Sequence, residues 1–506
     1  MFTGDMLLAD IVSTSNAVAA TRSRKAKVAA LAECLGAATR NELPVVTAYL
    51  GGSLLQRRTG LGWRSLTTLP PPVADASLTV SDVHEAFERM SLLTGSGSQV
   101  ARAAEAEALF GAATTAEQVW LRGVVTGEVR QGALDSLVQE ALAVAAGVPL
   151  PAVRRAAMLA GSTVVVAGLA FDGEAALAEV GLVVGRPVMP MLASSAGSVE
   201  EALAKIGGPA VVDTKLDGIR IQVHRRGDEV VIATRTLDDI TARLPEVAEI
   251  VRRLPVASVV LDGEAMLVGP DRRPRPFQET ASRTATRGEA TAVVAPFFFD
   301  VLHLDGADLL GSPLSERLAL LDSVVPAEHR IARVVTDDPA AGEAFAAGAL
   351  AGGQEGVVVK GLEVPWEAGR RGSGWIKVKP VHTLDLVVLG VEWGSGRRKG
   401  WLSNIHLGAR GPDGFVMIGK TFKGMTDQML AWQTERFSEL ALADPHSDWA
   451  VEVRPEQVVE IAFDGVQRST RYPGGVALRF ARVVRYRDDK TAAEADTIAT
   501  VQGFLA

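Results

Sequence analysis

Cysteine is almost absent from this chain, since Cys34 is the only one in 506 residues. A single thiol excludes disulfide bonds within the chain and any zinc site built from several cysteines. Long apolar runs are also absent: the most apolar stretch, residues 162–171, is too short to span a bilayer. The N-terminus has no cationic segment before an apolar core, so we expect no secretory signal and a cytoplasmic protein.

An excess of positive charge is missing as well. The chain has 52 Lys and Arg against 60 Asp and Glu, which gives a net charge of −8. This balance argues against a protein coated with nucleic acid, although it allows a local basic groove. With 47% hydrophobic and 22% charged residues, the composition is typical of a soluble globular protein. The length predicts two to four domains.

The composition changes twice along the chain. Residues 1–185 are rich in Ala, Leu, Glu and Arg, with apolar residues at helical spacing, and predict an all-helical domain. Residues 186–382 alternate β-rich runs with helices and predict an α+β domain. Residues 383–506 contain short strands separated by glycine turns and predict a small β-barrel. We therefore expect a multidomain α+β protein, with its first linker in the proline- and serine-rich residues 185–198.

The clearest candidate for a reactive side chain lies in residues 211–223. Two apolar runs flank Lys215-Leu216-Asp217-Gly218-Ile219-Arg220, which predicts two strands joined by a tight turn. The same pattern predicts strand, turn and strand over residues 259–267, around Asp262-Gly263. A lysine beside an aspartate and an arginine at a turn is a candidate nucleophile, and we expect Lys215 to become covalently attached to a nucleotide.

Several other segments place charged residues at the end of an apolar run. They are Asp262–Glu264, Phe299–Asp300, Glu355–Lys360, Trp375–Lys379 and residues 479–490. Lys377 and Lys379 are two residues apart on a predicted strand, so they share a face. Two lysines on one face indicate an anionic partner or, alternatively, an edge strand protected by lysine.

In this order, the motifs resemble those of covalent nucleotidyltransferases, and specifically those of ATP-dependent DNA ligases of bacterial or archaeal type. Residues 215–220 match the K-x-D-G-x-R nucleophile motif, and residues 261–264, 355–360 and 375–379 match the later motifs. Residues 185–192 resemble the segment before the adenylation domain, and residues 397–402 and 419–426 resemble the ligase OB domain. The resemblance is strong from residue 185 onward. The helical part resembles the family's DNA-binding domain more loosely.

The resemblance implies a helical DNA-binding domain, an adenylation domain and a C-terminal OB-fold barrel. It also implies an enzyme that seals nicks in duplex DNA with ATP and Mg²⁺, through a lysyl–AMP intermediate and an adenylated 5′-phosphate. A monomer associated with the nucleoid, acting in DNA replication, repair or recombination, is expected. Whether a sliding clamp recruits it stays open.

The resemblance further implies that Lys215 is the nucleophile, in a motif shared with Asp217. A group of residues is expected to hold ATP: Asp213, Arg220, Arg235, Glu264, Phe299, Arg371, Lys377 and Lys379. Lys360 is singled out as the end of the matching segment 355–360. Asp213 stands where relatives usually carry glutamate next to the adenine, and Phe299 is expected to stack on that base or, alternatively, to be plain core. Glu264 and Glu355 are the expected Mg²⁺ ligands.

The last motif of the family is expected to orient pyrophosphate. Its candidate residues are Arg479, Arg482, Asp488 and Lys490. Because these residues belong to the barrel and Lys215 to the preceding domain, we expect a rotation of the two domains about residues 379–385.

Two other functions compete with a DNA ligase. One is an RNA ligase or an mRNA capping guanylyltransferase, and the other is a non-enzymatic OB protein that binds nucleic acid. The large helical segment favours duplex DNA, and a mere binding protein would not need the charged set around Lys215. Residues 414–421 satisfy the P-loop pattern G-x-x-x-x-G-K-[ST], but their bulky apolar centre predicts a strand instead.

Overall fold

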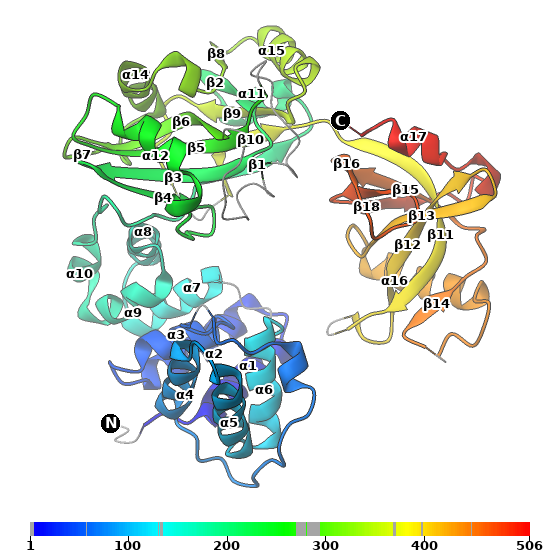
Figure 1. Ribbon diagram of the computed structural model, residues 1–506, viewed down its shortest axis with the longest axis horizontal. Coiled ribbons are helices and arrows are strands. Elements are labelled where there is room, and N and C mark those ends of the chain that lie inside the picture. Colours follow the sequence, from blue (N-terminus) through cyan, green and yellow to red (C-terminus); the bar gives the residue numbers. More distant parts are fainter. Residues whose placement is uncertain are drawn as a thin grey trace.

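The computed structural model describes residues 5–56, 58–129, 131, 135–269, 280, 294–367, 371–395, 398–446 and 448–505, with the backbone alone for 371–373. Figure 1 shows three bodies along the chain: helices, then a central body of sheets and helices, then a C-terminal body connected through β11. Each body contains a buried apolar cluster of its own. Arg397, expected in the OB domain, lies outside the described residues.

The N-terminal body consists of helices in its described part. These are α1 (Leu8–Ala20), α2 (Arg24–Ala37), α3 (Leu43–Leu50), α4 (Val80–Leu92), α5 (Ser98–Gly111), α6 (Thr115–Thr126), α7 (Asp135–Ala146), α8 (Leu150–Ala160), α9 (Thr163–Asp172), α10 (Glu174–Ala178) and a 3-10 turn at Trp63–Leu66. Helix α4 illustrates why they form. Thr79 and Asp82 cap its first turn reciprocally, and its buried residues recur at helical spacing. Among the described residues, no helix is both long and apolar enough to cross a membrane.

The central body is built on two five-stranded sheets. The first has the order β1 (Leu192–Ala196), β10 (Arg371–Val378), β9 (Gly356–Gly361), β2 (Ala210–Lys215) and β8 (Arg333–Thr336). The second has the order β4 (Glu229–Thr234), β3 (Ile219–Arg226), β5 (Ser258–Leu267), β6 (Val294–Leu304) and β7 (Ala307–Asp308). The helices of this body are α11 (Val199–Ile206), α12 (Pro245–Arg252), α14 (Leu314–Val324) and α15 (Pro339–Ala351).

The two strands predicted on either side of Asp217-Gly218 are confirmed as β2 and β3. Strands β2 and β3 do not form a hairpin, because β2 pairs with β8 and β9 while β3 pairs with β4 and β5. The Asp217-Gly218 turn therefore crosses from one sheet to the other. A Cβ on Gly218 would lie 2.5 Å from the carbonyl oxygen of Ala265, so the turn can pass β5 closely only with glycine.

The prediction for residues 259–267 is wrong, because these residues form the single strand β5 rather than two strands and a turn. Gly263 lies inside this strand, where its register against β6 shifts. A Cβ there would approach Phe298 to 2.7 Å, so this glycine allows close packing of two strands instead of a reversal of the chain.

The C-terminal body is a curved antiparallel sheet with helices. Its main sheet has the order β13 (Gly414–Thr421), β12 (Leu402–Gly411), β11 (His382–Trp393), β15 (Val458–Phe463) and β18 (Arg482–Tyr486), and β14 (Ala450–Glu452) pairs with β11. Strands β16 (Gly465–Arg468) and β17 (Val476–Arg479) form a separate pair, and the helices are α16 (Asp427–Glu439) and α17 (Ile498–Gln502). The P-loop pattern at 414–421 is strand β13, which confirms its rejection.

Candidate nucleotide-binding site

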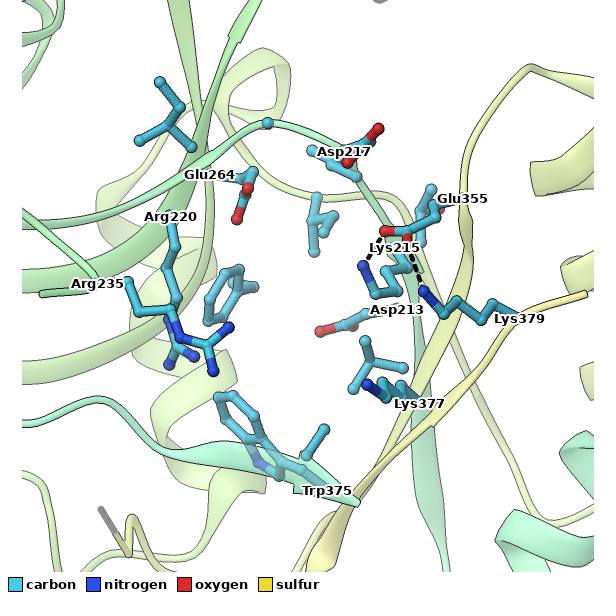
Figure 2. Close-up of a pocket in the computed structure, with 18 of the residues that line it drawn as sticks. Asp213, Lys215, Asp217, Arg220, Arg235, Glu264, Glu355, Trp375, Lys377 and Lys379 are labelled. Carbon is cyan, nitrogen blue, oxygen red and sulfur yellow. Dashed lines mark hydrogen bonds and ion pairs between the residues drawn. The ribbon is translucent and has the colours of Figure 1, made fainter. Parts of the chain in front are cut away.

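A cavity of about 480 Å³ lies between the two central sheets. Most of the side chains predicted from the sequence converge on it from different strands (Figure 2). They are Asp213, Lys215, Asp217, Arg220, Arg235, Glu264, Phe299, Glu355, Lys360, Lys377, Lys379 and Arg479. The crossing of the chain at residues 216–218 explains this convergence, because it places Lys215 at the end of one sheet and Arg220 at the start of the other.

Lys215 is at the centre of a short ionic chain. Its Nζ contacts Glu355 Oε2, and Glu355 Oε1 accepts a hydrogen bond of 2.8 Å from Lys379. Burial alone would raise the pKa of Glu355, but Lys215 and Lys379 outweigh it and lower that pKa. Figure 2 shows both lysines directed at this one carboxylate. Glu355 therefore pairs with both lysines at once.

A second ion pair lies deeper in the cavity wall. Lys360 Nζ is 2.6 Å from Asp213 Oδ2, and both side chains are almost fully buried. Burial raises the pKa of Asp213, opposed by the charge of Lys360. Lys360 also lies 4.2 Å from the ring centroids of both Phe299 and Trp375. The short side chain of Asp213 is therefore directed to a lysine of its own sheet.

The Arg220 guanidinium is held by three hydrogen bonds within the protein. Its guanidinium donates to both oxygens of Asp262, at 3.0 and 2.7 Å, and to the carbonyl oxygen of Met191, at 2.6 Å. Burial would lower the pKa of Arg220, but Asp262 raises it. The positive charge of Arg220, which the resemblance assigns to ATP binding, is thus already paired with Asp262 within the protein.

Aromatic rings form the wall near Arg220. Phe299 meets Trp375 edge to face with centroids 5.8 Å apart, and Trp375 meets Trp366 at 5.5 Å. Arg220 lies 5.6 Å from the rings of Phe299 and Trp375. Such a wall can accept a flat aromatic base, while Lys215, Lys377 and Lys379 in the same cavity lining suit phosphate.

Glu264 and Arg235 complete the cavity beside Arg220 (Figure 2). Glu264 is paired in register with Arg220 across β3 and β5, and burial raises its pKa to about 8. Arg235 follows β4 and has an exposed side chain, so it remains accessible to an anion. The side chain of Arg371 lies outside the described residues, and only its backbone is placed, at the start of β10.

Comparisons with known proteins show the family of this chain. Residues 190–379 match the family model of the ATP dependent DNA ligase domain, and residues 398–490 match that of the ATP dependent DNA ligase C terminal region. The Probable DNA ligase of Nocardioides sp. is 68% identical, over 99% of this chain and 99% of its own. The Probable DNA ligase of Kineococcus radiotolerans is 66% identical, over 98% and 99%. This chain belongs to the ATP-dependent DNA ligase family.

The fold of the ligase has a counterpart among solved structures. Pmar-Lig_PreS3 covers 94% of this chain and 99% of its own with a TM-score of 0.64, at 16% sequence identity. At that identity the likeness concerns the fold alone. It extends to the helical part, which neither family model covers.

The residues predicted for the last motif of the ligase lie in two separate places. Arg479 reaches the cavity and donates to Asp217 at 2.5 Å, and Phe480 beside it also lines the cavity. Arg482 lies 3.3 Å from Asp464. The other predicted residues, Asp488 and Lys490, do not line this cavity.

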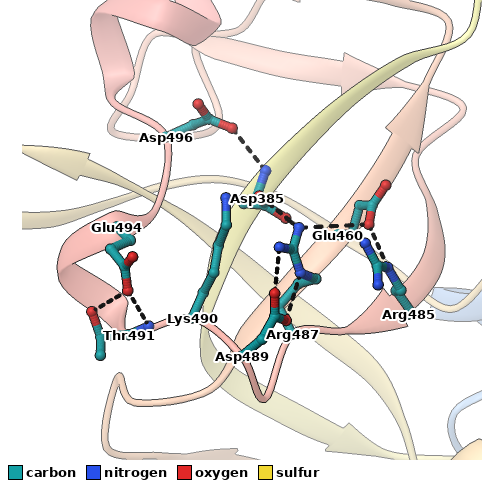
Figure 3. Close-up of polar contacts among 9 residues, drawn as sticks. All are labelled: Asp385, Glu460, Arg485, Arg487, Asp489, Lys490, Thr491, Glu494 and Asp496. Atoms are coloured by element: carbon teal, nitrogen blue, oxygen red, sulfur yellow. Dashed lines mark hydrogen bonds and ion pairs between the residues drawn. The ribbon is translucent and has the colours of Figure 1, made fainter.

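Asp488 and Lys490 are held within the C-terminal body instead. Asp488 accepts a hydrogen bond of 2.9 Å from Gln457. Lys490 donates at 2.6 Å to Asp385, which also accepts from Arg487 (Figure 3). The backbone N–H of Asp385 donates to the carboxylate of Asp496, and the backbone N–H of Asp496 donates to the carbonyl oxygen of Asp385. The start of β11 and the end of the last motif therefore belong to one ionic network.

The described residues contain no cluster of three or more His, Cys, Asp or Glu that could hold a metal. Magnesium usually binds through one or two carboxylates together with substrate phosphates and water. Glu355 and Glu264 both line the cavity and fit such a partial donor set. The residues present are thus compatible with Mg²⁺ that arrives with a nucleotide.

The sequence did not single out Trp366, Trp375, Asp262 and Phe480 as individual site residues. Trp375 could have been found by alternation, since it lies two residues before Lys377 on β10 and shares its face. Phe480 has a positive φ of 55°, which is unusual for a bulky residue. No sequence pattern predicts this backbone conformation.

Proposed function

We propose that Lys215 is the nucleophile of this ligase and that the cavity between the two central sheets binds ATP. The observation that carries the proposal is the position of Lys215, opposite a wall of aromatic rings and beside Lys377 and Lys379. The base of ATP would lie against Phe299 and Trp375. Its α-phosphate would then lie at the lysines.

Lys215 can attack only as a neutral amine, and its ordinary pKa is about 10.4. It must therefore leave Glu355 and lose a proton before the reaction. Its Nζ then forms a bond with the α-phosphorus, while the bond from that phosphorus to the bridging oxygen breaks and pyrophosphate leaves. Lys377 and Lys379 would neutralise the charge that develops on the phosphate.

Two further transfers complete the ligase reaction. The AMP moves from Lys215 to the 5′-phosphate at a nick, and the 3′-hydroxyl of the other strand end then attacks that phosphate and releases AMP. Glu355 and Glu264 would hold Mg²⁺, which supplies charge neutralisation on the phosphates when bound. Asp213 and Lys360 would fix the base end of the cavity. Arg220 would fix the aromatic wall, since it is bonded to Asp262 and Met191.

We place the domain boundaries near residues 185 and 382, with the helical part and the C-terminal body both contacting duplex DNA. Lys490, Asp488 and Arg482 would act on pyrophosphate only after the C-terminal body rotates about residues 379–385. Arg235 and Arg371 are proposed to bind phosphate oxygens at the rim. We propose a monomer that acts at the nucleoid.

One assay tests the site. The protein is incubated with α-labelled ATP or GTP and Mg²⁺, denatured, and examined for labelled protein. We expect label from ATP, lost on acid treatment because a phosphoramidate is acid-labile. Label from GTP alone would favour a capping guanylyltransferase, and no label would contradict the proposed nucleophile. Sealing of nicked DNA compared with nicked RNA then separates a DNA ligase from an RNA ligase.

A further inference from the structure

Two residues at one corner of the C-terminal body contact the nucleotide cavity. Asp464 Oδ2 lies 2.5 Å from Lys379 Nζ, and Arg479 donates to Asp217 at 2.5 Å. The corner is one structural unit, because the backbone N–H of Asp464 donates to the carbonyl oxygen of Arg479 at 3.0 Å and Gly465 pairs with Arg479 across β16 and β17. It therefore presents one negative and one positive side chain to an oppositely charged pair.

The contact with Lys379 is well enclosed. The side chain of Asp464 is 11% exposed and that of Lys379 is 16% exposed. Burial would lower the pKa of Lys379, but Asp464 and Glu355 together raise it. Lys379 thus pairs with two carboxylates in this structure, Glu355 of the central body and Asp464 of the C-terminal body.

We propose that Asp464 is a positioning residue that occupies Lys379 in place of the α-phosphate of ATP, and that ATP must displace it. This inference rests on the proposed function, which assigns Lys379 to that phosphate. A carboxylate and a phosphate oxygen offer a lysine the same kind of charged acceptor, so they compete for one ammonium group. Displacement of Asp464 also removes one of the contacts that hold the C-terminal corner against the cavity.

The direct consequence concerns ATP affinity in the adenylation step. Asp464→Asn keeps the size of the side chain and removes its charge, so the α-phosphate competes for Lys379 with one carboxylate, that of Glu355, instead of two. We expect the KM for ATP to fall about fivefold, the effect of one partly screened ion pair. The rate at saturating ATP should not fall. Asp464→Glu keeps the charge and should retain the KM of the unchanged protein.

Glu392 of the C-terminal body offers a matched control. Its side chain is 10% exposed and lies 2.5 Å from Lys420, so Glu392→Gln also removes one buried charge from a lysine pair. Its described partners, His406, Asn404 and Lys420, all belong to the same body. Glu392→Gln should leave the KM for ATP unchanged.

The experiment measures the initial rate of protein labelling against ATP concentration, without DNA, for the unchanged protein and these variants. Thermal unfolding identifies a variant that does not fold, and Asp464→Ser provides a second neutral variant in that case. A lower KM in the neutral variants alone supports the inference. An unchanged or higher KM in folded neutral variants overturns it. If the unchanged protein is not labelled, the proposed function fails instead.

Discussion

Lys215 and Glu355 form an ion pair although 140 residues separate them in the chain. Lys215 ends β2, and Glu355 immediately precedes β9, which pairs with β2 in the same sheet. The backbone supports the pair, because the N–H of Glu355 donates to the carbonyl oxygen of Lys215 at 3.0 Å. The proposed nucleophile is thus positioned by the pairing of β2 with β9 and by its ion pair with Glu355.

Replacing Glu355 with glutamine tests its proposed role as a metal ligand. We expect Glu355→Gln to slow protein labelling at least about tenfold and to raise the Mg²⁺ concentration needed for half the maximal rate. The measurement is the labelling rate as a function of Mg²⁺ concentration. Glu363→Gln, an exposed carboxylate after β9, is the control. An unchanged Mg²⁺ dependence would show that Glu355 only pairs with lysine.

Replacing Phe299 with leucine tests the aromatic wall. Leucine keeps an apolar side chain but removes the ring that meets Trp375. We expect the KM for ATP in protein labelling to rise about fivefold to tenfold, which corresponds to the loss of one aromatic stacking contact. The maximal rate should change less. Should the KM stay the same while stability falls, Phe299 would be plain core, the alternative that its neighbours Phe297 and Phe298 suggest.

Replacing Asp262 tests whether Arg220 needs its partner for stability. The side chains of Arg220 and Asp262 are 17% and 1% exposed, so Asp262→Ala leaves a buried guanidinium without its carboxylate. We expect the free energy of unfolding in urea to fall by about 3 kcal/mol. Glu229→Ala removes the exposed pair with Arg226 and should cost less than about 1 kcal/mol. Equal losses in the two variants would contradict the assigned difference in burial.

Acid should weaken the connection between the helical part and the sheet that carries Arg220. His224 accepts a hydrogen bond from the backbone of Gly185, and burial lowers its pKa to about 4. Between pH 6.5 and 4 the unfolded chain takes up a proton on this histidine and the folded protein does not, so stability falls as the pH falls. Above pH 6.5 this contribution is complete.

The variant His224→Gln removes that titration. Thermal unfolding at pH 7.5 and pH 5 should therefore show a smaller difference between the two pH values in His224→Gln than in the unchanged protein. His329→Gln serves as control, because its ring is bonded to the carbonyl oxygen of Pro296 in the same body. An identical pH dependence in His224→Gln and the unchanged protein would contradict a buried, neutral His224.

The sequence alone located most of the cavity, because the charged residues stand at the ends of apolar runs and strand ends meet at a sheet edge. It did not establish which strands pair. The segment around Asp217-Gly218 has the pattern of a hairpin turn, yet its strands enter different sheets, since pairing depends on distant partners such as β8 and β5. A hairpin and a crossing between two sheets show the same local sequence pattern, which is two apolar runs separated by a turn.

The ion-pair partners of the charged residues in the site could not be predicted from the sequence either. Asp262 and Asp464 carry no local signal for their partners Arg220 and Lys379, which lie 42 and 85 residues away. Lys490 and Asp488 are predicted for the last motif, yet in this structure they contact Asp385 and Gln457 of their own body, which lie 105 and 31 residues away in the chain. Their proposed role depends on a second orientation.

The most direct test of the whole account is the labelling of Lys215. After incubation with α-labelled ATP and Mg²⁺, the unchanged protein should carry acid-labile label, and peptide mapping should place it on Lys215. Lys215→Arg should reduce the label to background, while Lys205→Ala, an exposed lysine paired with Glu201 on α11, should be labelled fully. Undiminished label in Lys215→Arg, or label mapped to another lysine, would contradict the central claim.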